Sequence, residues 1–98
     1  MNVQHGTGYE TWPDGAFFSG IYIDGKKQGE GNFTWGNGCY YKGNFKINML
    51  EGEGFFQWSD GRSYNGTWSY DNMNGFGEFS WPDGRRYIGK FMNDKIYD

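Results

Sequence analysis

Few side chains of this sequence could do chemistry, and they are far apart along the chain. His5 is the one histidine and Cys39 the one cysteine. A catalytic histidine would need a partner, and a metal ion would need three or four ligands. The carboxylates Glu51, Glu53 and Asp60 are typical of solvated surface groups rather than of a paired acid and base. The sequence therefore predicts no catalytic site, no metal site and no cofactor.

Glycine pairs of the form Gly-x-Gly are the pattern closest to a ligand-binding motif. They lack the third glycine and the following helix of a nucleotide-binding turn. Instead they recur every 23 residues, at Gly6/Gly8, Gly29/Gly31, Gly52/Gly54 and Gly75/Gly77. A fixed period of this size is the signature of a repeat protein. Residues 1–98 are thus interpreted as a single array, with repeats at about 6–28, 29–51, 52–74 and 75–97.

Each repeat contains the signals of a tight turn between two strands. A tryptophan is followed at the second position by Asp or Asn and then by glycine, as in Trp12-Pro13-Asp14-Gly15. This order favours a type I turn that a left-handed glycine closes with a bulge. A connection of about six residues, such as residues 46–51, is then expected to lead to the next hairpin.

Aromatic residues and glycines alternate along one side of the expected strands. Tyr41, Gly43 and Phe45 share a side, because neighbouring residues of a strand point to opposite faces. Glycine leaves a gap there in which a ring can lie over bare backbone. We expect a structural ladder of stacked rings made of Trp12, Trp35, Trp58, Trp81, Tyr41, Tyr64, Tyr87, Phe45, Trp68 and Phe91. The predicted fold is all-β: an elongated, twisted, single-layer β-solenoid or groove of four 23-residue antiparallel β-hairpin repeats.

The opposite side of the strands differs between the middle and the ends of the array. The two middle repeats carry mainly polar residues there, such as Asn32, Lys42 and Asn65. The end repeats carry apolar residues, which need cover by a flanking segment or a neighbouring repeat, or by docking or self-association. The candidate partner-binding residues are Tyr9, Phe17, Ile21, Ile23, Phe76, Ile88 and Met92.

The charge of the chain argues against nucleic acid as a partner, since the net charge is −3 and the pI about 5.0. The candidate lipid-binding residues are Lys26, Lys27, Arg85, Arg86 and Lys90. Lipid-binding clusters usually contain about four to eight basic residues, so membrane lipid is predicted as a secondary partner. The sequence shows no membrane-spanning run and no signal peptide. With a single cysteine, this pattern favours a cytoplasmic protein.

Together these residues resemble the MORN (membrane occupation and recognition nexus) repeat. The family pattern runs Tyr-x-Gly-x-Trp, Gly-x-Gly-x-aromatic and Asp-Gly. Its matches here are Tyr64-Asn65-Gly66-Thr67-Trp68, Gly75-Phe76-Gly77-Glu78-Phe79 and Asp83-Gly84. The resemblance extends over about residues 6–96. It departs at Glu10, where later repeats have phenylalanine, and at Asp98, where the next Gly-x-Gly pair would begin.

The resemblance implies a non-catalytic module that binds proteins or membranes. Members occur in cytoskeletal and axonemal assemblies, at membrane contacts and beside lipid-kinase domains. We expect a scaffold in the cytoskeleton or cilium that holds a protein partner, either a helix or an extended segment, along its sheet. The alternative is a module that binds phosphoinositides or anionic membranes and that could be appended to a kinase or another enzyme domain. The terminal strand edges also predict self-association, and a choline- or glucan-binding module is a third class with similar rings.

Overall fold

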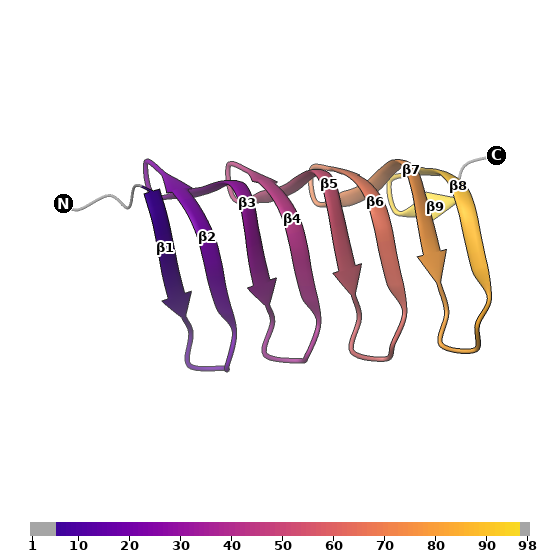
Figure 1. The fold of residues 1–98 in the computed structure, drawn as a ribbon, viewed down its shortest axis with the longest axis horizontal. Helices are drawn as coiled ribbons and strands as arrows, with labels where there is room; N and C mark the ends of the chain where they lie inside the picture. Colours follow the sequence, from indigo (N-terminus) through magenta and orange to yellow (C-terminus); the bar gives the residue numbers. More distant parts are fainter. Residues whose placement is uncertain (1–5, 97–98) are drawn as a thin grey trace.

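The computed structural model describes residues 6–96 and contains nine strands in one open sheet. The strands are β1 (Gly6–Thr11), β2 (Phe17–Ile23), β3 (Lys26–Thr34), β4 (Tyr40–Lys46), β5 (Met49–Gln57), β6 (Ser63–Ser69), β7 (Asn72–Ser80), β8 (Arg86–Met92) and β9 (Lys95–Ile96). Each strand pairs antiparallel with its neighbours in sequence, so β1 and β9 lie at opposite ends of the sheet (Figure 1). The predicted all-β array of antiparallel hairpins is confirmed.

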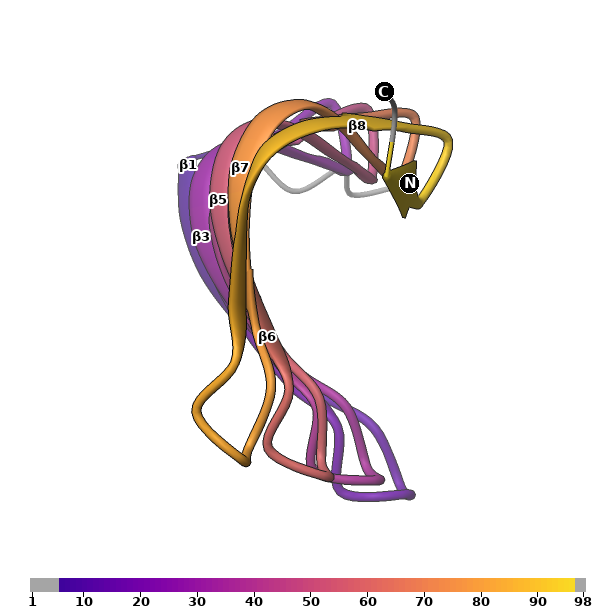
Figure 2. The same cartoon turned by 90° about the vertical axis from the view of Figure 1, so that its right-hand side faces the viewer.

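The sheet is elongated and curved. Its extents are 47 × 24 × 16 Å, and its radius of gyration is 14.3 Å, compared with about 13 Å for a compact domain of similar length. Viewed from the end, the strands trace an open arch (Figure 2). Because the sheet does not close, its inner side remains accessible as a long concave surface.

The tight turns at one edge of the sheet have the predicted form. Trp12 N donates to Ala16 O at 2.9 Å, and Gly15 N donates to Trp12 O at 3.1 Å. Asp14 Oδ1 accepts a further bond from Ala16 N at 2.9 Å, and Gly15 has the left-handed φ of 95°. The same pattern of bonds recurs at the turns of the three later repeats.

The connections between repeats are shorter than predicted. β4 ends at Lys46 and β5 begins at Met49, so the expected six-residue connection at 46–51 is wrong. Ile47 and Asn48 have φ values of 48° and 66°, as in a type I′ turn, whose twist matches that of the flanking strands. The residues after the turn can therefore pair with β4. Equivalent two-residue turns lie at Asp24-Gly25, Tyr70-Asp71 and Asn93-Asp94.

Side chains in these two-residue turns tie each repeat to the one before it. Asp71 Oδ1 accepts a hydrogen bond from Leu50 N at 2.7 Å, and Asp71 N donates to Leu50 O at 3.1 Å. Asn48 and Asp94 make equivalent bonds to β3 and β7. The first turn has Gly25 at this position, which offers no such side chain.

A row of glycines crosses strands β1 to β8. Cross-strand pairing places Gly8, Gly20, Gly31, Gly43, Gly54, Gly66, Gly77 and Gly89 side by side. A Cβ added at Gly54 would overlap the hydroxyl of Tyr41, and one at Gly43 would lie 2.6 Å from Glu53 O. Because the row carries no side chains, rings lie directly on the backbone and the sheet folds over them.

The concave side carries two continuous rows of aromatic rings. The floor row consists of Tyr22, Phe18, Phe45, Tyr41, Trp68, Tyr64, Phe91 and Tyr87, with successive ring centroids 4.9–5.7 Å apart and ring planes close to perpendicular. The groove row consists of Trp12, Phe33, Trp35, Phe56, Trp58, Phe79 and Trp81, with centroids 4.6–5.4 Å apart. Every residue of the expected ladder lies in one of these rows. Leu50 and Met73 complete the buried core.

Candidate functional site

The groove row is the part of the aromatic core that faces solvent. The floor row is buried apart from the half-buried Tyr87, whereas all rings of the groove row except Phe79 are partly exposed. Aromatic surface that is rigidly stacked and still accessible is common at binding sites. The concave side is therefore the strongest candidate site of the described chain.

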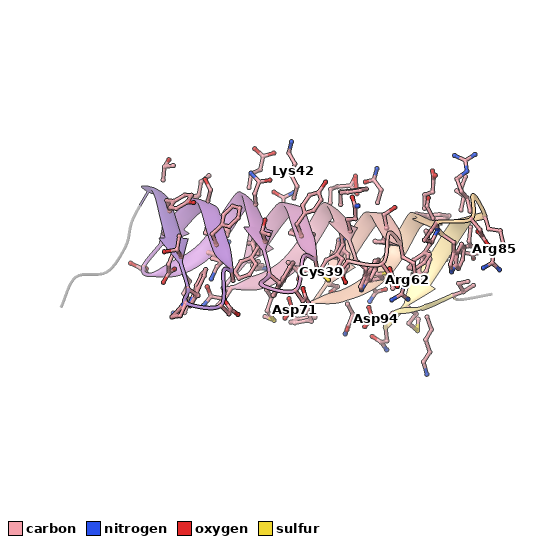
Figure 3. The ribbon with its side chains drawn as sticks, turned by 90° about the horizontal axis from the view of Figure 1, so that it is seen from below. Cys39, Lys42, Arg62, Asp71, Arg85 and Asp94 are labelled. Atoms are coloured by element: carbon pink, nitrogen blue, oxygen red, sulfur yellow. The ribbon has the colours of Figure 1, made fainter. Side chains whose placement is uncertain are left out.

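Two hollows open between the rings of the groove. The first hollow has a volume of about 400 Å³ and is lined by Lys27, Phe33, Trp35, Phe45, Asn48, Leu50, Phe56 and Asp71. The second hollow has a volume of about 330 Å³ and is lined by Arg62, Met73, Phe79, Trp81, Phe91, Asp94, Lys95 and Ile96. Figure 3 shows Asp71 and Asp94 on the side of the ribbon opposite Lys42. Each hollow thus has an apolar floor and a polar rim.

The hollows are two repeats apart, and Trp68 lies between them. Trp68 occupies the position that Phe45 has in the first hollow and Phe91 in the second. Its larger ring packs 5.7 Å from that of Phe56. Its Nε1 donates a hydrogen bond to Gly54 O at 3.2 Å. A tryptophan therefore stands between the two hollows at the position where each hollow has a phenylalanine.

Lys27 lies among aromatic rings at the wall of the first hollow. Its Nζ is 5.2 Å from the ring centroid of Phe18 and 5.6 Å from those of Trp12 and Phe33. The Tyr22 ring is 6.0 Å away. These distances are in the range of cation–π attraction. This end of the groove therefore presents a positive charge from within its aromatic wall.

Glu10 gives the same end of the groove a carboxylate. It accepts a hydrogen bond from the hydroxyl of Tyr22 at 2.5 Å. Burial raises the pKa of the Tyr22 hydroxyl, and the bond to Glu10 and its negative charge raise it further. Burial also raises the pKa of Tyr41 and Tyr64. These hydroxyls are therefore structural hydrogen-bond donors, not groups that titrate near neutral pH.

Two arginines cover tryptophans at the edge of the tight turns. The guanidinium of Arg62 lies 5.3 Å from the ring of Trp58, and that of Arg85 lies 5.2 Å from the ring of Trp81. Each arginine also pairs with the aspartate of its own turn at 2.8 Å. The backbone amides of Arg62 and Arg85 and then their side chains lower the pKa of these aspartates. The C-terminal half of the groove thus has a rim of neutral ion pairs.

The candidate partner-binding residues lie on the convex side, in two groups. Tyr9 stacks on Phe17 with centroids 6.0 Å apart, and Tyr9, Ile21 and Ile23 are exposed. At the other end Phe76, Ile88 and Met92 are exposed. The sheet separates both groups from the concave rings, so they form no part of the groove.

The candidate lipid-binding residues are not brought together. Lys27 lies against the concave rings, and Arg85 lies on Trp81. Arg86 pairs with Glu78 at 3.2 Å, and Lys90 covers Phe76 on the convex side at 5.4 Å. Lys26 is exposed at the start of β3. The five basic groups therefore face different surroundings.

The carboxylates noted in the sequence have structural partners. Glu51 accepts a bond from Tyr70 N at 3.1 Å, and Asp60 pairs with Arg62. Cys39 is buried, and His5 lies outside the described residues. Within residues 6–96 no three His, Cys, Asp or Glu side chains gather as metal ligands. No helix in this range is long and apolar enough to cross a membrane.

Sequence reasoning placed Lys27 among lipid-binding residues and missed its place in the groove. The signal was the 23-residue step, because Lys27 stands where later repeats have Leu50, Met73 and Ile96. A convex aromatic pair was also missed: Tyr40 and Phe55 have ring centroids 5.9 Å apart.

Comparison with known families gives one result. The model for the MORN repeat matches the chain at residues 1–17, 18–40, 41–61 and 64–85, which is most of its length. The matches that begin at residues 18, 41 and 64 start in the second strand of a hairpin and run on into the next hairpin. A search of curated proteins found no significant match.

Proposed function

The chain belongs to the MORN repeat family, and we propose that it is a non-catalytic scaffold that binds a segment of a partner protein in its concave groove. The observation that carries this proposal is the groove row itself. Seven stacked rings extend across all four hairpins, and most of them keep one surface accessible.

Stacking makes this surface suitable for binding. Each ring of the groove row is held by its neighbours, so docking would order few side chains and lose little conformational entropy. Aromatic residues also contribute strongly to the binding energy of protein interfaces. The groove row is therefore a preformed binding surface that would change little when a partner binds.

The two hollows set a spacing for the partner. They are two repeats apart, which is four strands, and neighbouring strands lie about 4.8 Å apart, so the hollows are separated by about 19 Å. An extended segment that rises about 3.3 Å per residue would span this distance in about six residues. The proposed ligand is therefore a segment with two apolar side chains about six residues apart.

The first test is selection of groove-binding peptides. A phage-displayed library of random peptides about 16 residues long covers the proposed spacing. We expect recovered peptides to carry two apolar residues at that spacing and to bind Trp35→Ala at least about tenfold more weakly than the wild type. Phe76→Ala is the matched control, because it removes an aromatic ring from the convex side, where Phe76 is 65% exposed.

The outcome of this selection decides between faces of the sheet. Peptides that bind Trp35→Ala and the wild type equally, or that depend on Phe76, would contradict the groove as the binding surface. Urea unfolding of both variants would verify that each remains folded. We infer a cytoskeletal or ciliary setting from the family alone.

Lipid binding is the alternative, and flotation with liposomes tests it. We expect no flotation with phosphoinositide-containing liposomes at about 0.15 M salt, where surface charges are screened beyond about 8 Å. The scattered positions of Lys27, Arg85 and Arg86 support this expectation. Flotation with anionic lipid that the Arg85→Ala/Arg86→Ala variant loses would favour the membrane function instead.

A further inference from the structure

The position of Lys27 is apolar in every other repeat. The 23-residue step aligns it with Leu50, Met73 and Ile96. Leu50 and Met73 are buried in the core beside the floor row. The backbone at Lys27 is the same as at the later positions, since Asn48 Oδ1 accepts a bond from Lys27 N at 2.8 Å as Asp71 does from Leu50. A lysine therefore occupies a position at which the packing of the repeat favours an aliphatic side chain.

The two acids at this part of the groove accept hydrogen bonds from neutral donors. Glu10 accepts from the hydroxyl of Tyr22, and Asp71, which lines the same hollow, accepts from Leu50 N. Between residues 6 and 96 no carboxylate forms an ion pair with Lys27. The rings around it supply cation–π attraction but cannot accept a strong hydrogen bond. The ammonium thus retains its capacity to bind an anion.

The first hollow offers the space for a side chain beside this charge. Phe33, Phe45 and Leu50 form apolar parts of its lining, and Lys27 lies at its wall. An ion pair formed among apolar rings is screened less by water than one on an open surface. An apolar residue alone would fill the hollow and leave the charge unpaired, which is unfavourable. The hollow is therefore complementary to an apolar residue with an acidic neighbour.

We propose that Lys27 selects a partner segment with an aspartate or glutamate side chain next to the apolar residue that fills the first hollow. This inference rests on the proposed groove function and adds the chemistry of the bound segment and which of its two apolar residues enters the first hollow. The carboxylate would bind at the β1–β3 end of the groove, so that the second apolar residue extends toward the hollow near β9.

The peptides selected on the wild-type protein test the proposal. We expect Asp or Glu to be enriched beside one of the two apolar residues, and Lys27→Met to bind such a peptide about tenfold more weakly. Methionine suits the position because Met73 occupies it in another repeat. Lys42→Met is the matched control, since Lys42 is exposed on the convex side and its removal changes the net charge equally.

A double-mutant cycle separates a direct ion pair from a loss of packing. Replacing the peptide's Glu by Gln should weaken binding to the wild type about tenfold and leave binding to Lys27→Met almost unchanged. Equal losses on both proteins, or selected peptides without an acidic residue, would overturn the role of Lys27 and leave the groove function standing. Failure to recover any groove-dependent peptide would overturn both. Raising the salt concentration should weaken the Glu peptide more than the Gln peptide on wild type, a reading that needs no variant.

Discussion

The first hairpin and the later ones share a backbone but line the concave side with different chemistry. Beside β1 and β2 the groove contains Glu10, Tyr22 and Lys27. The equivalent positions of the next repeat are Phe33, Phe45 and Leu50, which pack as rings and aliphatic core. The difference shows that the glycines and turns specify the fold. The residue types at the groove positions can vary without changing that fold.

The largest expected effect concerns the glycine row in the middle of the sheet compared with its end. Gly54→Ala should lower the free energy of unfolding by about 3 kcal/mol, because its Cβ would overlap the Tyr41 hydroxyl. Gly8→Ala should cost only about 1 kcal/mol, because its Cβ meets the Tyr22 ring at 2.8 Å in a terminal hairpin that can shift. Urea unfolding measures both. Equal costs would mean that the rings at the end of the glycine row are held as tightly as those in the middle.

The next effect compares the aliphatic and the cationic residue at one position of the repeat. Leu50→Ala should lower the free energy of unfolding by about 2.5 kcal/mol, since Leu50 is 7% exposed and packs in the core. Lys27→Ala should lower it by less than about 1 kcal/mol, the value of a partly exposed cation–π contact. Urea unfolding of both variants measures these two losses. A large cost for Lys27→Ala would make Lys27 a structural residue and weaken its assignment to binding.

A smaller effect concerns the bond that ties each repeat to the one before. Asp71→Gly keeps a residue that tolerates the φ of 67° but loses the 2.7 Å bond to Leu50 N, so we expect a loss of about 1 kcal/mol. Asp71→Asn is the control, because Asn48 makes this bond at 2.8 Å. If both variants unfold like the wild type, the bond does not stabilise the stacking, and the lack of a side chain at Gly25 has no consequence for the first repeat.

The sequence predicted most of the fold because the fold demands particular residue types at a fixed period. Tryptophans and glycines such as Trp35 and Gly38 mark the tight turns. The glycine row is visible as the second glycine of each Gly-x-Gly pair and as the glycine between two aromatic residues, such as Gly43. The two-residue connections at Ile47-Asn48 and Tyr70-Asp71 were missed because they lack the glycine that usually marks a type I′ turn, whereas Asp24-Gly25 carries that signal. Positive φ at Ile47 is sterically unusual, and tertiary contacts support it: its N–H donates to the Gln28 side chain at 3.1 Å.

The candidate site was less predictable, because it depends on how deeply each ring is buried in the curved sheet. Which rings face solvent depends on how the sheet curves, and the two hollows form where side chains from several strands meet. Sequence alone predicts which residues alternate between the two faces of the sheet. It does not predict which rings are exposed or where hollows form. In the sequence, Lys27 groups with Lys26 as a candidate lipid-binding residue because both are basic. Adjacent residues of a strand point to opposite faces, however, and only Lys27 reaches the concave rings.

The smallest effect tests the polar end of the groove through pH. The raised pKa of Tyr22, Tyr41 and Tyr64 means that above about pH 10, where unfolded tyrosines titrate, the unfolded chain binds fewer protons than the folded one. The free energy of unfolding should therefore decrease as pH rises above that value.

Tyr22→Phe should be less stable than wild type by about 0.5 kcal/mol near neutral pH, because the bond to Glu10 is lost. Above about pH 10 the difference should shrink or reverse, since the variant lacks one of these hydroxyls. Urea midpoints at about pH 8, 10 and 11 measure both terms, and a constant difference across this range would show that the Glu10–Tyr22 pair does not hold its proton as the structure implies.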